Sequence, residues 1–176
     1  MANRIYMPDK AEKRIDSLAM SNGLTSVFVD VLALSGSALA QSNREKEMII
    51  WIAQRDQSIV GIGTVGFNID EMPWTIENFE QEKQFLLQVI DGAIAETGWE
   101  RLSYEPTKKF IQAALTHFSK MIMAMEEEYV DPTQYEEWSA IEDGDDCPTI
   151  PIGYPRCEKH MIYLSCHGCV ICNYET

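Results

Sequence analysis

Apolar residues recur at three- and four-residue steps in two long segments of the second half of the chain. The first segment runs from Thr75 to Gly98, and the second follows Pro106. The apolar positions are Ile76, Phe79, Leu86, Leu87, Ile90, Ala93 and Ile94 in the first, and Phe110, Ala114, Phe118, Ile122, Met125 and Tyr129 in the second. This spacing is that of an amphipathic helix. We expect two helices, one ended by Gly98 at its C′ position and one with Pro106 in its first turn.

The first half of the chain predicts three further helices with less regular patterns. Residues 10–20 read as the first, ended by Ser21-Asn22-Gly23. The second runs from a Thr25 cap to about Gln41 and is apolar on nearly every face, which predicts a central position. Small residues at 35–37 would let another element approach it closely. The third follows Ser42-Asn-Arg-Glu45, which has the form of a capping box.

Two short segments need a choice between structures. Met48 to Ala53 suits either the third helix or a strand, because the run is short and rich in β-formers, and we prefer the helix. Gly61 to Gly66 matches G-x-G-x-x-G, but a dinucleotide site needs a helix at these glycines, and Phe67 to Pro73 lacks helical periodicity. A glycine-rich hairpin or loop packed on the helices is therefore expected.

The C-terminal segment has the residues of a metal site. Positions 157–176 hold four of the five cysteines and two of the three histidines. Cys157-x2-His160 and Cys169-x2-Cys172 form two short turns, each able to direct two ligands at one zinc ion. Residues 161–165 alternate as one strand would, so the segment resembles a generic zinc ribbon or knuckle. That resemblance implies a structural role and names no function.

A different ligand set, or cysteines without a metal, would also fit the spacing. Cys166 and His167 are further candidate ligands. Cys166-x2-Cys169 is an equally valid pair on spacing alone. Without a metal the cysteines would be unrelated reduced thiols, or a disulfide framework that needs an oxidising compartment. A catalytic zinc keeps one position for water, whereas ligands here are in excess within sixteen residues. The pattern therefore favours a closed, structural site.

Charge is unevenly distributed along the chain. The net charge of −14 argues against general nucleic-acid binding, because phosphates repel such a surface. Positions 121–155 contain no Lys, Arg or His. They contain ten acidic residues, Glu126, Glu127, Glu128, Asp131, Glu136, Glu137, Glu142, Asp143, Asp145 and Asp146, and four aromatic residues, Tyr129, Tyr135, Trp138 and Tyr154. The stretch is either a solvated linker or a binding face.

A binding face of this composition would suit a basic protein partner. Negative charge raises the association rate with a basic protein, and an aromatic side chain supplies buried area. The residues that we expect to contact the partner are Glu136, Glu137, Trp138, Asp143, Asp145 and Asp146. Immunity proteins, antitoxins and inhibitors that mimic nucleic acids are analogous in charge and size.

The sequence as a whole predicts a mainly α protein of 176 residues. We expect a helical body at 1–130, an acidic connector at 131–156 and a zinc-binding hairpin at 157–176, all in one domain. No secretory h-region is recognisable at the N-terminus, and the most apolar run, 27–40, is shorter than the ~18 residues of a membrane span. A cytoplasmic, non-enzymatic protein is expected. A zinc-dependent enzyme and a zinc-ribbon protein associated with nucleic acid are the alternatives.

Overall fold

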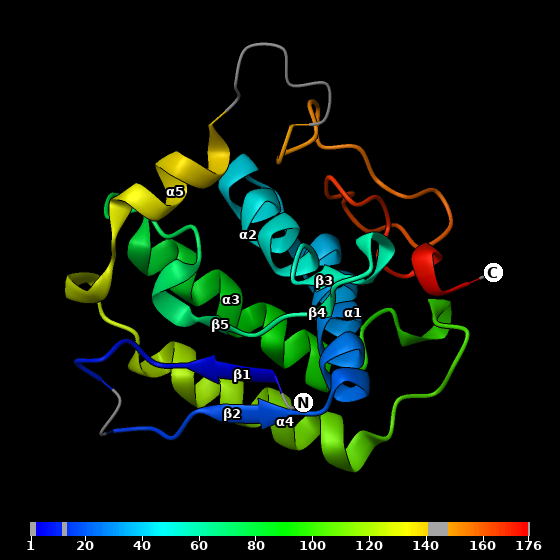
Figure 1. Cartoon of the computed structure of the whole chain (residues 1–176), viewed down its shortest axis with the longest axis horizontal. Helices are drawn as coiled ribbons and strands as arrows, with labels where there is room; N and C mark the ends of the chain where they lie inside the picture. Colours follow the sequence, from blue (N-terminus) through cyan, green and yellow to red (C-terminus); the bar gives the residue numbers. More distant parts are fainter. Residues whose placement is uncertain (1–2, 12–13, 141–147, 176) are drawn as a thin grey trace.

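The computed structural model describes residues 3–11, 14–140 and 148–175, and in these residues the protein is mainly α (Figure 1). The helices are α1 (Asn22–Leu39), α2 (Asn43–Ala53), α3 (Phe79–Ile94), α4 (Lys108–Ala124) and α5 (Pro132–Ser139). The strands are β1 (Asn3–Tyr6), β2 (Leu18–Met20), β3 (Asp56–Gln57), β4 (Gly63–Thr64) and β5 (Phe67–Asn68). The expected mainly α class is thus confirmed, and the structure also contains small sheets.

Helix α1 lies at the centre and packs against α2, α3 and α4. The small residues in its middle allow this close packing, as expected. Ser35 Oγ donates a hydrogen bond of 2.7 Å to the carbonyl of Val89 on α3. A Cβ atom added to Gly36 would lie 2.1 Å from Ile49 Cδ1 on α2. One apolar core then extends from Ile5 to Ile171, so the C-terminal segment is part of the same packing.

The N-terminal segment differs from the expectation of a first helix at 10–20. Strand β1 pairs with β2 in antiparallel register, Asn3 opposite Met20, and with β5 in parallel register. Few apolar residues were available for a helix face, and the pairing instead buries Ile5 and Met20 against the helices. Ser21 begins α1 rather than ending a helix, since its side chain accepts a hydrogen bond from the backbone of Leu24. Thr25 therefore lies inside the first turn and is not the cap.

The predicted ends of the other helices agree with the structure in part. The capping box of Ser42 and Glu45 is confirmed, and the run 48–53 is helical. Helix α3 ends before Gly98, because Glu96 adopts the left-handed conformation after the Ala95 cap, with a φ of 67°. Gly98 instead precedes a short 3-10 turn, Trp99–Arg101.

The glycine-rich segment forms a hairpin, as expected. Strands β3 and β4 pair in antiparallel register around a 3-10 turn at Ser58–Val60. β5 then joins the N-terminal sheet, where a Cβ atom on Gly66 would lie 2.1 Å from the carbonyl oxygen of Arg4. No described helix begins at these glycines, which removes the basis for a dinucleotide site.

Helix α1 is also the most apolar segment of the chain. By length and composition it is able to cross a membrane, since it has 18 residues with a mean hydropathy of 1.3. However, 61% of it is buried inside the fold, and core helices of soluble proteins pass the same test. The burial of α1 is compatible with a soluble protein.

Candidate metal centre

Four ligand atoms converge in the C-terminal segment. The group consists of Cys157, His160, Cys169 and Cys172, and its ligand atoms all lie within 4.8 Å of one another. His160 Nδ1 lies 3.6, 3.5 and 3.2 Å from the Sγ atoms of Cys157, Cys169 and Cys172, and the Sγ atoms of Cys157 and Cys172 are 3.6 Å apart. A tetrahedral zinc with bonds of about 2.3 Å to sulfur and 2.0–2.1 Å to nitrogen requires edges of roughly 3.5–3.8 Å. Three of these four separations fall in this range and the fourth is 0.3 Å below it, so the group is compatible with a single zinc ion.

Two tight turns set the directions of the ligands. In the first, the backbone N–H groups of His160 and Met161 bond to Cys157, to its Sγ at 3.4 Å and to its carbonyl at 2.7 Å. In the second, the backbone N–H of Cys172 donates to Cys169 Sγ at 3.4 Å. N–H groups aimed at sulfur favour the thiolate form, which is the form that binds a metal.

The expected strand at 161–165 is not formed. Two isolated bridges, Arg156 with Tyr163 and Ser165 with Gly168, are the pairing that the described residues show there. Met161 has a φ of 60°, which interrupts an extended run, and the consecutive residues Ile162 and Tyr163 are both buried. The metal group is consequently built from turns packed on the core, without the regular hairpin of a zinc ribbon.

A second set of contacts orients the histidine. His160 is fully buried, and its Nε2 lies 3.0 Å from Glu175 Oε1. Glu175 in turn pairs with Lys159, whose hydrogen bond lowers the pKa of the Glu175 carboxyl. A carboxylate on the outer nitrogen fixes the tautomer that leaves Nδ1 free to bind a metal. Sequence reasoning missed Glu175, since a lone acid near the terminus carries no spacing signal.

The thiols of the group differ in acidity. Burial raises the pKa of Cys169 to about 12. Burial also opposes ionisation of Cys157, but hydrogen bonds with His160, Cys172 and the backbone of Lys159 together outweigh it and lower the pKa of Cys157 to about 7. A metal must displace the proton of Cys169, so binding is expected to release protons and to strengthen as pH rises.

The other two candidate ligands, Cys166 and His167, lie outside the converging group. Cys166 is half-buried, and its Sγ is 3.6 Å from Gln54 Nε2 on the body. His167 is held by its backbone, with its N–H on Ser165 Oγ and its carbonyl on the Asn173 amide. The ligand group that the structure brings together is the one the spacing favoured.

The expected partner-binding residues are only partly on the surface. Glu136 and Glu137 are exposed on α5. Trp138 is half-buried, and its indole N–H donates a hydrogen bond of 2.6 Å to Gln54 Oε1. Asp143, Asp145 and Asp146 lie outside the described residues.

A buried ionic network holds the acidic connector on the body. Arg44 on α2 bonds to Glu47 at 2.8 Å and to Glu82 on α3 at 2.9 Å. The hydroxyl groups of Tyr135 and Tyr154 donate to Glu47 at 3.0 and 2.7 Å, from the two sides of residues 141–147 in the sequence. The network was not expected from the sequence, since its residues are far apart and show no common motif.

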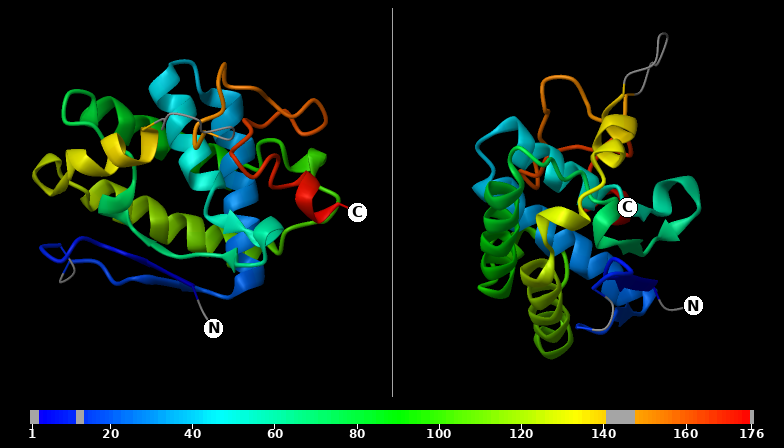
Figure 2. Two further views of the ribbon diagram at one scale, coloured as in Figure 1. Left: turned by 45° about the horizontal axis from the view of Figure 1, so that its top comes forward. Right: turned by 90° about the vertical axis from the view of Figure 1, so that its left-hand side faces the viewer.

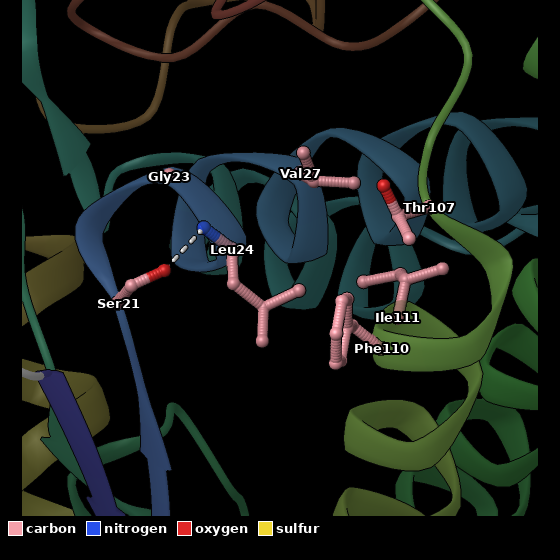
Figure 3. Close-up of a pocket in the computed structure, with 7 residues that line it drawn as sticks. All are labelled: Ser21, Gly23, Leu24, Val27, Thr107, Phe110 and Ile111. Atoms are coloured by element: carbon pink, nitrogen blue, oxygen red, sulfur yellow. Dashed lines mark hydrogen bonds between the residues drawn. The ribbon is translucent and has the colours of Figure 1, made fainter.

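An apolar pocket lies away from the metal group, between the first turns of α1 and α4 (Figure 3). It has a volume of about 420 Å³, with Leu24, Val27, Phe110 and Ile111 as its walls and Ser21 and Thr107 at its rim. None of the residues that line it is acidic, basic or a cysteine, so the lining supplies no general acid or base.

Comparison with protein-family models, with curated proteins and with solved structures finds no match for this chain. Function must therefore be argued from the chain's own residues. They define a mainly α protein with a Cys3His group near the C-terminus that could hold a metal ion.

Proposed function

We propose that the protein is a non-enzymatic, acidic binding module that docks or neutralises a basic protein and carries a structural zinc. The Cys3His group supports the zinc, because four protein ligands that lie within 4.8 Å of one another would complete a tetrahedral shell and leave no position for water. The same feature disfavours the alternative of a zinc-dependent enzyme, which needs an open position and a base.

The zinc would fasten the C-terminal segment over α1. The backbone N–H of Tyr163 donates to Ser37 Oγ on α1, and the hydroxyl of Tyr174 lies within hydrogen-bond distance of Ser26 and Ser58. Figures 1 and 2 show this segment beside α1 and the β3–β4 hairpin, with β1 and β2 beside α4. A metal that joins residues 157 and 172 closes this segment into one unit, so its loss should loosen the segment before the helical core.

Serine variants of two neighbouring cysteines test the zinc assignment. Cys172→Ser removes a proposed ligand, whereas Cys166→Ser changes the same residue type outside the converging group. Elemental analysis should find about one zinc per chain in the wild type and in Cys166→Ser, and markedly less in Cys172→Ser. Zinc lost from the Cys166 variant and kept in the Cys172 variant would show that the ligand set is wrong.

The basic partner is proposed from exposed acids in the connector and in the turn just before it. Glu127 and Glu128 are exposed in a 3-10 turn, and Glu136 and Glu137 are exposed on α5. Positions 121–155 supply no cation to neutralise them. Such a surface attracts a basic protein over a Debye length, about 8–10 Å at physiological salt. In this proposal Trp138 positions α5 on the body, and charge makes the first contact with the partner.

The partner test compares two variants with the same change in charge. One converts the acids Glu127, Glu128, Glu136 and Glu137 to Gln, and the control converts the exposed acids Glu77, Glu80, Glu100 and Glu105 to Gln. The partner is first captured with the tagged wild-type chain, identified, purified and then used in binding kinetics. We expect the connector variant to lose about tenfold or more in association rate at low salt, and the control to lose much less. Equal losses would mean that net charge alone acts, and an acidic partner would refute the proposal.

A further inference from the structure

Two buried carboxylates lie beneath the C-terminal segment without full hydrogen bonding. Asp30 on α1 and Asp56 on β3 are each 3% exposed. Among the described residues, Asp30 Oδ1 and Asp56 Oδ2 have no hydrogen-bond partner. Buried polar atoms are almost always paired with protein, water or an ion, so two unpaired carboxylate oxygens in one region indicate a ligand.

Hydroxyl groups from other segments surround the two acids. Tyr104 donates to Asp30 Oδ2 at 2.7 Å. Asp56 Oδ1 accepts from the Ser58 backbone at 3.1 Å and from the Tyr174 hydroxyl at 3.2 Å. The Tyr174 hydroxyl also lies 3.1 Å from Ser26 Oγ on α1. Ser26 and Asp30 are four residues apart on α1, and so share one face of the helix. Oxygen atoms from α1, the hairpin, the 102–107 loop and the C-terminal turn are thereby brought together.

No cation among the described residues compensates these acids. Neither Asp30 nor Asp56 takes part in an ion pair. Burial raises the pKa of Asp30 to about 7, the Tyr104 hydrogen bond opposes this, and the negative charges of Asp56 and Glu175 add to the increase. Two buried carboxyl groups near a third acid therefore lie without a compensating positive charge, which a bound cation would supply.

We propose that Asp30 and Asp56 hold a hard divalent cation, with Ca²⁺ as the fitting class, in a second site distinct from the Cys3His group. The unpaired oxygen of each acid is a free ligand, and the nearby hydroxyls of Ser26 and Ser58 add neutral oxygen. Oxygen ligands select hard cations, whereas the thiolates and imidazole of the first group select zinc. Ca²⁺ tolerates irregular oxygen geometry, unlike Mg²⁺. The ion would join α1, the hairpin and the C-terminal segment.

Calcium titration of the full, zinc-loaded chain tests this site. Isothermal titration should show about one saturable Ca²⁺ per chain, and the ion should raise the melting temperature of the wild type. Asp30→Asn and Asp56→Asn keep the side-chain shape, remove one charge, and should weaken binding by at least about tenfold. Glu136→Gln combined with Glu137→Gln is the control, since these acids are exposed on α5, and it should bind as the wild type does.

The two Asn variants are informative even if their stability changes. Without Ca²⁺ and at about pH 8, above the pKa of Asp30, Asp30→Asn should melt higher than the wild type, because a buried charge is gone, and added Ca²⁺ should no longer raise its melting temperature. The proposal is overturned if the wild type shows no saturable Ca²⁺ site, or if both Asn variants retain it. Protons would then neutralise the cluster.

Discussion

Replacing Glu82 by Ala should destabilise the protein strongly. Glu82 is 3% exposed and accepts four hydrogen bonds, from two nitrogens of Arg44 and from the backbone and hydroxyl of Thr75, at 2.8–3.0 Å. Removing one partner of a buried ion pair costs about 3–5 kcal/mol, because the other charge stays buried. Arg44 keeps its bond to Glu47, so we expect the lower end, about 3 kcal/mol.

Equilibrium urea unfolding followed by circular dichroism measures this change. Thermal unfolding is a second measurement. A loss of 1 kcal/mol lowers the melting temperature of a chain of this size by about 2–4 °C, so the melting temperature should fall by roughly 6–12 °C. Glu80→Ala is the matched control on the same helix, since Glu80 is exposed, and it should change the free energy of unfolding by less than about 0.5 kcal/mol. A loss below about 1 kcal/mol for Glu82→Ala would refute the view that this network holds α2 and α3 together.

Three further substitutions test other parts of the structure. Gly66→Ala places a Cβ against the backbone of Arg4 and should cost about 1–3 kcal/mol in urea unfolding, whereas Gly23→Ala meets open space in α1 and should stabilise by up to about 1 kcal/mol. Ser42→Ala removes the cap of α2 and should cost about 1 kcal/mol, measured in the same way. The pKa of Asp30 is raised from 3.8 to about 7 in the folded state. Without Ca²⁺, wild-type stability should therefore fall as the pH rises from about 4 to about 7, and should not fall further because of Asp30 above that pH. Stability curves at about pH 5 to 8 should show this trend relative to Asp30→Asn, and identical curves would contradict it.

The long helices were predictable because their apolar periodicity records which face is buried. In α4 the expected positions Phe118 and Ile122 are fully buried, as is Met125 at its C-cap, although Phe110 is 59% exposed beside the apolar pocket. The N-terminal sheet was not predictable, because β1 also pairs with a strand that is far away in the sequence, with Ile5 opposite Phe67 on β5. Ser21 is ambiguous locally, since the same residue types end one helix and begin another.

The ligand group could be proposed from spacing alone, since two x2 turns encode their own geometry. The contacts that support the ligand group could not be predicted from the sequence. Glu175 reaches His160 only because the chain turns back after Cys172. The charge of Asp56 acts on Asp30 only because α1 packs against the hairpin. Tertiary contacts of this kind leave no pattern in the sequence.

The acidic connector has one side that packs on the body and one side that faces solvent. Its aromatic residues Tyr135 and Trp138 turn inward to Glu47 and Gln54, while Glu136 and Glu137 between them face solvent. On a helix this alternation separates an anchoring side from a charged side. A face made of carboxylates attracts a partner but buries little apolar area, so binding through it should be fast and strongly dependent on salt. Tight binding would then need apolar contacts elsewhere, and the β3–β4 hairpin exposes Ile59, Val60 and Ile62 by 56, 57 and 64%.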